Sequence, residues 1–268
     1  MSIEFQNISY QYPNSKKGIF DINISIPSGK TTVIIGKTGS GKSTFLKLLD
    51  GLFTPSSGKI VTENKIIIQP KTTEKQLINY RKMIGFVFQQ PQKQLFAATV
   101  LEDVEFALRN FNLPIQKAKE TLLALNVAEE LWNNSVLDLS IGQKRLVALA
   151  GVIAYQPKYL IFDEPTSGLD RENSENIFNF IQDNKNQKTT QIIVTHDLDL
   201  FTPIADNIII FDQGKIIANG NYQDVFYQII NNYDNFPLPT LIKIAKKLGL
   251  KTMPKSQDQL IKLMESNE

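Results

Sequence analysis

The chain has 268 residues, 42% hydrophobic and 21% charged, proportions that exclude a disordered, collagen-like or coiled-coil protein and predict one large domain with a small appendage. The net charge of +2 is too small to bind nucleic acid by bulk charge, so we expect no nucleic-acid partner and a local site for any anionic ligand. The chain has no cysteine and one histidine, which excludes disulfides, thiolate chemistry and Cys/His zinc sites.

The N-terminal region shows the alternation of half-exposed strands. Residues 3–8 and 22–26 alternate apolar with polar side chains and each run ends in turn residues. A period of two residues is typical of a strand with one face in water. We therefore expect an antiparallel β subdomain at the start of the chain.

Three later runs are short, apolar and rich in β-branched residues: 31–35, 159–162 and 191–194. Such runs are typical of strands that helices cover on both faces. They predict a parallel sheet and an α/β fold.

The stretch from about residue 90 to 157 reads as a helical subdomain. Thr99 and Glu102 have capping-box spacing before a helical run that reaches about Asn110, and a second helical pattern follows Pro114 through Leu125. The longest uncharged apolar run, 146–155, is half of the ~20 residues that span a bilayer, so no membrane-crossing segment is expected.

The C-terminal end reads as a separate helical piece. Prolines interrupt the chain at 237 and 239, and apolar residues then recur at helical spacing over 241–248. We expect a main domain over residues 1–230 and a C-terminal helical extension over 231–268.

A phosphate-binding motif follows the strand at 31–35 and precedes a helical run from Thr44. It reads Gly36-Lys37-Thr38-Gly39-Ser40-Gly41-Lys42-Ser43 and satisfies G-x-x-x-x-G-K-[ST]. Its N–H groups would bind phosphates, Lys42 would neutralise β/γ oxygens, and the Ser43 hydroxyl would ligate Mg²⁺. A glycine-rich turn with an exposed lysine is the simpler alternative, but it does not explain the strand and helix on either side.

Two acids end the apolar run 159–162. Asp163 would lie at the carboxyl edge of the parallel sheet, where it can hold Mg²⁺ directly or through water. Glu164 is then placed to orient and polarise the water that attacks the γ-phosphate. The alternative for Glu164 is a surface acid beside a helix.

The segment Leu139-Ser140-Ile141-Gly142-Gln143 resembles the Leu-Ser-Gly-Gly-Gln signature of the ATP-binding-cassette (ABC) ATPase family. The resemblance extends to about residue 225 and implies a P-loop NTPase (RecA-like) core whose helical subdomain carries the signature. It also implies a dimer of two ATPases, in which Ser140, Gly142 and Gln143 contact the ATP of the partner. Ile141 departs from the family pattern, and Ser140 alone would also suit a helix N-cap.

Four further positions match the family's motifs. The resemblance implies that Tyr12 stacks on adenine, although an aromatic residue there also suits a structural role. It implies that Gln89 or its neighbour Gln90 contacts Mg²⁺ and senses the membrane partner. Asp170 would close the loop that reaches the other ATPase, and His196 would act at the γ-phosphate.

A finer resemblance lies in residues 88–96, followed by Thr99-Val100. This stretch is similar to ATPase subunits of energy-coupling-factor importers of vitamins and metal ions. That resemblance implies an ATP-hydrolysing subunit on the cytoplasmic face of the membrane, with an integral scaffold, a substrate-binding membrane subunit and a second ABC ATPase as partners. Leu95 and Phe96 are then expected to face the scaffold, and Ile141 favours a heterodimer over a homodimer.

Two other classes of protein explain the sequence less completely. A soluble ABC ATPase for DNA repair or ribosome work would carry a long coiled coil or a second cassette, but Lys42 and Ser140 are separated by only about a hundred residues without sustained heptads. A small-molecule P-loop kinase would leave the signature segment, Asp170 and His196 unexplained.

Overall fold

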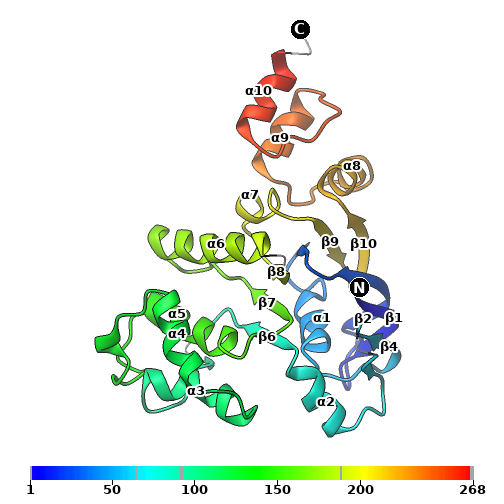
Figure 1. Ribbon diagram of the computed structural model, residues 1–268. Helices are drawn as coiled ribbons and strands as arrows, with labels where there is room; N and C mark the ends of the chain where they lie inside the picture. The colour runs from blue at the N-terminus through cyan, green and yellow to red at the C-terminus, as the bar shows by residue number, and fades with distance from the viewer. Residues whose placement is uncertain (1, 64, 91–92, 188, 266–268) are drawn as a thin grey trace. The chain divides into compact units, whose positions relative to one another are not determined.

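The computed structural model describes residues 2–63, 65–90, 93–187 and 189–265 (Figure 1). The chain divides into two compact units, one of residues 1–77 with 185–268 and one of residues 78–184. The first unit contains β1 Ser2–Gln11, β2 Gly18–Pro27, β3 Thr31–Gly36, α1 Lys42–Leu49, β4 Ser57–Val61, β5 Ile67–Ile68, β8 Thr190–Val194, α7 Leu198–Phe201, β9 Asn207–Asp212, β10 Lys215–Gly220, α8 Tyr222–Asn232, α9 Thr240–Lys247 and α10 Gln257–Glu265. The second contains β6 Ile84–Val87, α3 Val100–Asn110, α4 Gln116–Ala124, the 3-10 helix η2 Glu129–Leu131, α5 Ile141–Ile153 and β7 Tyr159–Asp163, while α2 Glu74–Arg81 and α6 Arg171–Asn186 cross the unit boundaries.

The antiparallel subdomain is confirmed. A four-stranded sheet has the order β2-β1-β4-β5, and β1 pairs antiparallel with β2 and β4. Burial alternates along β2, as expected for a strand with one face in water.

The parallel strands are confirmed as well. In the first unit β3 pairs parallel with both β8 and β9, and β10 joins β9 antiparallel, giving the order β10-β9-β3-β8. Every residue of β3 and β8 is buried, in agreement with the apolar runs that predicted them. In the second unit β6 and β7 form a parallel pair.

Helix α1 packs between the two sheets of the first unit. Phe45 is fully buried, and its ring centroid lies 4.6 Å from that of Phe5 on β1 and 5.2 Å from that of Phe211 on β9. Because one aromatic side chain contacts both sheets, the start of α1 is held firmly at the end of β3.

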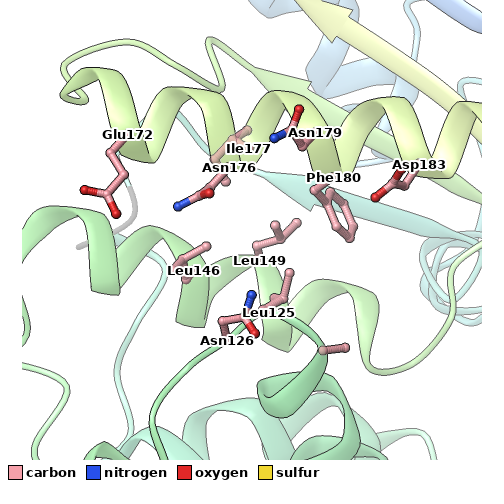
Figure 2. Close-up of a pocket in the computed structure, with 11 residues that line it drawn as sticks. Leu125, Asn126, Leu146, Leu149, Glu172, Asn176, Ile177, Asn179, Phe180 and Asp183 are labelled. Atoms are coloured by element: carbon pink, nitrogen blue, oxygen red, sulfur yellow. The ribbon is translucent and has the colours of Figure 1, made fainter.

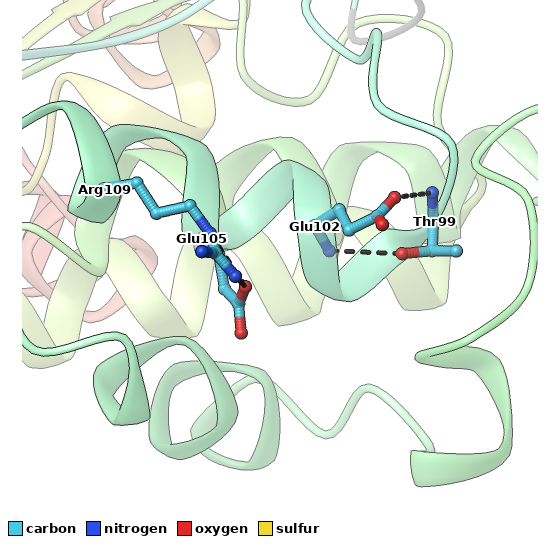
Figure 3. A network of polar contacts seen from close by, with 4 residues as sticks. All are labelled: Thr99, Glu102, Glu105 and Arg109. Carbon is cyan, nitrogen blue, oxygen red and sulfur yellow. Dashed lines mark hydrogen bonds and ion pairs between the residues drawn. The ribbon is translucent and has the colours of Figure 1, made fainter.

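Side-chain caps define the starts of the two principal helices of the second unit. At α3 the predicted capping box forms: Thr99 N donates to Glu102 Oε2 at 3.1 Å, and Glu102 N donates to Thr99 Oγ1 at 3.3 Å (Figure 3). Ser140 caps α5 in the same way, with Gln143 as its reciprocal partner. These caps fix the residues that begin each helix.

The C-terminal segment forms helices α9 and α10, which share a small core of Ala245, Leu250 and Leu260. Gln223 of α8 anchors this segment through hydrogen bonds with the Lys251 carbonyl at 3.1 Å and the Met253 N–H at 2.8 Å. Among the residues that the structure describes, no helix has the length and apolar character needed to cross a membrane.

Candidate functional site

The glycine-rich loop after β3 has the backbone that only glycine provides easily. Gly41 precedes α1 with φ of 112°, and a Cβ there would lie 2.8 Å from Ile19 Cγ2. A Cβ on Gly36 would lie 2.4 Å from the Phe211 carbonyl oxygen. Since the first N–H groups of a helix have no acceptor within it, and no side chain caps α1, this end suits an anion.

Lys42 points back into this loop. Its Nζ donates to the carbonyl oxygens of Gly36 at 2.5 Å and Lys37 at 3.1 Å, and the side chain is only 7% exposed. The loop therefore encloses a fixed positive charge. The Gly214 N–H holds the other side of the loop by donating to the Ser40 carbonyl at 2.8 Å.

The phosphate loop also contains an unsatisfied polar atom. Ser40 Oγ is buried and has no hydrogen-bond partner in the part of the chain that the structure describes. A buried hydroxyl without a partner is costly, which suits a loop whose missing partner is an oxygen-rich ligand. Thr38 and Gly39 are exposed on the same loop, so its outer edge is accessible.

Tyr12 lies against the start of α1. Its hydroxyl and the Thr44 hydroxyl are 3.2 Å apart, and its ring meets those of Tyr10 and Phe53 edge to face. The first unit thus brings Tyr12 beside the phosphate loop. The same contacts suit a structural role, and stacking of Tyr12 on adenine stays a prediction.

His196 leaves the same edge of the sheet as the phosphate loop. Ile34 of β3 pairs with Val194 of β8 in parallel register, so Gly36 at the end of β3 and His196 just after β8 lie at the carboxyl ends of neighbouring strands. His196 is exposed, whereas Thr195 before it is buried. Ser43, the predicted Mg²⁺ ligand of the first unit, is likewise exposed at the start of α1.

The second unit gathers the other predicted groups around the ends of β6 and β7. Gln89, Gln90 and Asp163 line one cavity of 330 Å³ together with Phe88 and Lys93. Both glutamines face this cavity, so the choice between Gln89 and Gln90 stays open. The strand before them, β6, ends at Val87.

Glu164 has a strained backbone. Its φ of 51° lies in the left-handed region, which costs a residue with a Cβ about 1–3 kcal/mol. Strain of this kind persists where the surroundings fix it, commonly at functional sites. Lys65, Gln156 and Gln213 have the same kind of φ, so the strain agrees with the role that the motif predicts for Glu164 and does not identify a site by itself.

Asn173 lies against Gly142 of the signature segment and also binds Asp170, the residue expected to reach the second ATPase. A Cβ on Gly142 would lie 2.7 Å from Asn173 Nδ2, and that amide donates to both carboxylate oxygens of Asp170. Hydrogen bonds from the Asn173 backbone and side chain lower the pKa of the exposed Asp170 carboxyl. Ile141, the departure from the family pattern, is 64% exposed at the start of α5.

Another cavity of the second unit, of 580 Å³, lies between α5 and α6 (Figure 2). Leu149 and Phe180 contribute apolar surface, and Asn126, Asn176 and Asp183 contribute polar groups. None of the residues that the sequence predicts as functional lines this cavity, so it is distinct from the candidate site.

Two predictions need correction or limitation. Leu95 was expected to face a membrane partner together with Phe96, but it is 9% exposed and belongs to the core, whereas Phe96 is 63% exposed. The prediction is wrong for Leu95 because Gln94, Leu95 and Phe96 lie in an irregular segment. Without the side-chain period of a helix or strand, the sequence does not show which of these side chains turns inward. Pro91 and Gln92 of the same motif lie outside the described residues.

Sequence reasoning also missed side chains that shape the site. Arg145 is buried and donates to the carbonyls of Pro165 and Gln89. The buried Asp103 accepts the N–H groups of Phe96 and Ala97 at 2.8 Å each. The available signal was a charged residue inside an apolar helical run, 145–153 in the first case. Such a residue is buried only when it has partners.

A buried parallel sheet in which one strand runs into a glycine-rich loop and a helix defines a P-loop nucleotide-binding protein. The description "ABC transporter" fits residues 19–167, which match that family's model. The energy-coupling factor transporter ATP-binding protein EcfA2 of Streptococcus pyogenes serotype M3 is 38% identical over 263 residues, covering 95% of this chain and 94% of the relative.

Solved structures agree. The structure of cbiO1 from Clostridium perfringens, described as part of the ABC transporter complex cbiONQ, has a TM-score of 0.74 and 34% identity, covering 92% of this chain and 98% of that one. A dimeric ATP-binding cassette bound to ADP and Pi has a TM-score of 0.72 and 28% identity, covering 82% and 98%. The chain therefore belongs to the ABC transporter family, and it is an ATP-binding ATPase.

Proposed function

We propose that this chain is the ATP-hydrolysing subunit of an energy-coupling-factor importer that drives uptake of a vitamin or metal ion. The observation that carries the proposal is the 38% identity to the EcfA2 protein along 95% of the chain. The proposed partners are an integral membrane scaffold, a substrate-binding membrane subunit and a second ABC ATPase. The chain would then work as a peripheral protein on the cytoplasmic face, with residues 1–230 as nucleotide-binding domain and 231–268 as its extension.

For the nucleotide, the proposed roles follow the chemistry of each group. Residues 36–44 bind the phosphates, with Lys42 as the buried cation, and Tyr12 stacks on adenine. His196 acts at the γ-phosphate. Ser140, Gly142 and Gln143 bind the ATP of the second ATPase, and the Ser140 hydroxyl that accepts from Gln143 N at 3.2 Å retains its own proton to donate.

The oxygen donors of this chain suit Mg²⁺. Ser43, Gln89 and Asp163 offer a hydroxyl, an amide and a carboxylate, the hard ligands that Mg²⁺ prefers. Among the described residues no group of three or more His, Cys, Asp or Glu gathers, which fits an ion that takes its other ligands from phosphates and water. When bound, Mg²⁺ would neutralise charge on the β- and γ-phosphates, and Glu164 would orient the attacking water.

An exposed aromatic pair is the proposed contact with the scaffold. The rings of Phe96 and Phe106 lie 4.6 Å apart, edge to face, and are 63% and 46% exposed. The Asp103 carboxylate accepts the Phe96 N–H, which fixes the loop that presents this ring. The capping box at Thr99 begins the helix that carries Phe106, so both rings stand on a rigid support (Figure 3).

Replacing Phe96 and Phe106 by serine should release the chain from its membrane partner. Burying one phenylalanine is worth about 1.5–3 kcal/mol, so losing both rings should weaken the association at least about 100-fold. Co-purification with the integral subunit from detergent-solubilised membranes measures this, and ATP binding by the isolated chain should be unchanged. Leu95 is left intact because it is buried: replacing it would destabilise the fold, and misfolding would be mistaken for release from the partner.

Leu123→Ser is the matched control, because Leu123 is 52% exposed on α4 of the same unit. It should co-purify normally. If the double serine variant co-purifies as well as the wild type, the docking surface lies elsewhere. If the wild type itself finds no integral membrane partner, the importer function fails and a soluble ABC ATPase takes its place.

Ile141 leads us to propose a heterodimer. Its branched side chain is exposed beside Ser140, in the segment presented to the other ATPase's nucleotide. A homodimer would place isoleucine at both composite sites. With a partner that has glycine there, the site containing this chain's Lys42 and Glu164 would keep a standard signature.

Matched mutants of the purified transporter test this asymmetry. Glu164→Gln in this chain should abolish more ATP hydrolysis than the equivalent change in the second ATPase. Steady-state turnover of each singly mutated complex gives the comparison. Equal losses, or a fully active complex containing two copies of this chain, would remove the case for a heterodimer.

A further inference from the structure

Arg145 is a buried charge on the helix that begins at the signature. Its side chain is 3% exposed, and it lies in the second turn of α5, five residues after the cap Ser140. Burial lowers the pKa of its guanidinium because desolvation disfavours the charged form. Burying a guanidinium costs free energy because the charge loses its hydration, unless hydrogen bonds within the protein compensate for that loss.

Both of its hydrogen-bond acceptors are main-chain carbonyls of other loops. Nη2 donates to the Gln89 carbonyl at 2.6 Å, and Nη1 donates to the Pro165 carbonyl. Nε has no hydrogen-bond partner in the part of the chain that the structure describes. The guanidinium plane fixes the angle between its donors, so one side chain holds two loops at a set separation.

The Pro165 contact bears on Glu164. The proline ring fixes φ of residue 165, so a hydrogen bond at its carbonyl restrains the backbone directly after Glu164. The left-handed φ of 51° at Glu164 is a conformation that the residue by itself disfavours, and its own turn holds it in part, since Ser167 N donates to the Glu164 carbonyl at 3.2 Å. Arg145 adds a restraint on this turn from α5.

The Gln89 contact bears on the second loop. Gln89 lines the cavity that also contains Asp163, and its carbonyl is held by the same guanidinium. A second cavity, of 420 Å³, is lined by Gln89, Arg145 and Ser167 among others, so the side chain stands between these loops.

We propose that Arg145 is a positioning residue that holds the Glu164 backbone and the Gln89 loop in register with the signature helix. The proposal rests on the proposed role of Glu164 in hydrolysis. A shift of α5 then moves both loops together. Neither of its two hydrogen bonds goes to the loop of residues 36–44, so its loss should affect nucleotide binding less than hydrolysis.

Arg145→Gln in the full assembled transporter is the direct test. A misplacement of about 1 Å costs on the order of 100-fold in rate, so we expect kcat to fall about 10- to 100-fold. The KM for ATP and the affinity for nucleotide should change less than about threefold. A merely structural role would lower the melting temperature and the yield of folded protein but leave kcat per folded site unchanged.

A double mutant separates positioning of Glu164 from general damage. If Arg145 acts through Glu164, then adding Arg145→Gln to Glu164→Gln should lower single-turnover hydrolysis by less than about threefold. Independent effects would instead multiply. Multiplying effects, or an unchanged kcat in the folded Arg145→Gln variant, would overturn the proposal.

Two further variants keep the test decisive. Arg145→Lys keeps the charge and reaches only one of the two carbonyls, so we expect kcat to fall by an intermediate factor of about 3- to 10-fold. If Arg145→Gln does not fold, this variant serves as the test. A wild-type kcat in Arg145→Lys would then count against the proposal. Lys119→Gln, on the exposed surface of α4, should behave as wild type. Should Glu164→Gln alone retain full turnover, the proposed catalytic role fails, whereas an inactive Glu164→Gln with an active Arg145→Gln removes only the inference about Arg145.

Discussion

Replacing Glu164 by glutamine should lower steady-state ATP turnover of the assembled transporter at least about 100-fold while ATP binding remains intact. Glutamine keeps the size of the side chain but cannot accept a proton from water, and a positioned general base contributes about 10²- to 10⁴-fold. The variant leaves the hydrogen bonds of Lys42 to the Gly36 and Lys37 carbonyls in place. Phosphate release measures turnover, and a fluorescent ATP analogue measures affinity.

Glu120→Gln is the control for the loss of one carboxylate in the same unit, since Glu120 is exposed on α4 and far along the chain from the strand ends. Its turnover should match the wild type. Near-wild-type turnover of Glu164→Gln would show that another group orients the water. Lost nucleotide binding in that variant would show that Glu164 contributes to binding ATP before hydrolysis instead.

Local patterns predicted the elements that are encoded locally. The apolar run 31–35 and the glycine motif after it placed β3 and the start of α1, and the spacing of Thr99 and Glu102 placed the start of α3. Each of these signals depends on neighbours a few residues apart, so the rest of the fold has little influence on it.

The hairpin of β9 and β10 was not predicted, although the sequence contains a pattern that indicates it. Residues 208–211 form a buried apolar run, and the following Gln213 and Gly214 have φ of 46° and 78°. Two consecutive left-handed residues are typical of a tight hairpin turn. The glutamine concealed the turn, because Asn or Asp is usual at its position.

The site was predictable as motifs but not as contacts. Asp163, Glu164 and Gln89 could be placed at strand ends from the sequence, since parallel strands bring their carboxyl ends to one edge. The acceptors of Arg145 could not be predicted, because they are carbonyls of residues 20 and 56 positions away that tertiary packing alone brings to it. The burial of Leu95 beside an exposed Phe96 was hidden for the same reason.

Lys42→Ala should instead abolish tight nucleotide binding. The Nζ is enclosed by the Gly36 and Lys37 carbonyls, so the charge is already desolvated and positioned before a phosphate arrives. Hydrogen bonds to charged groups are worth about 1.5–3 kcal/mol, which corresponds to a loss of affinity of roughly 10- to 100-fold. Removing Nζ also leaves both carbonyls without this donor, so a lower melting temperature is expected.

Equilibrium titration of the folded chain with a fluorescent ATP analogue gives the affinity, and a thermal melt reports the stability in parallel. Lys30→Ala is the matched control, because Lys30 is an exposed cation just before β3 and its removal changes the net charge equally. It should bind nucleotide as the wild type does. Lys42→Arg separates charge from geometry: if the compact ammonium is what the loop requires, arginine, which is bulkier and planar, should restore the melting temperature more than the affinity. Wild-type affinity in folded Lys42→Ala would mean that the backbone N–H groups of the loop hold the phosphates without the lysine.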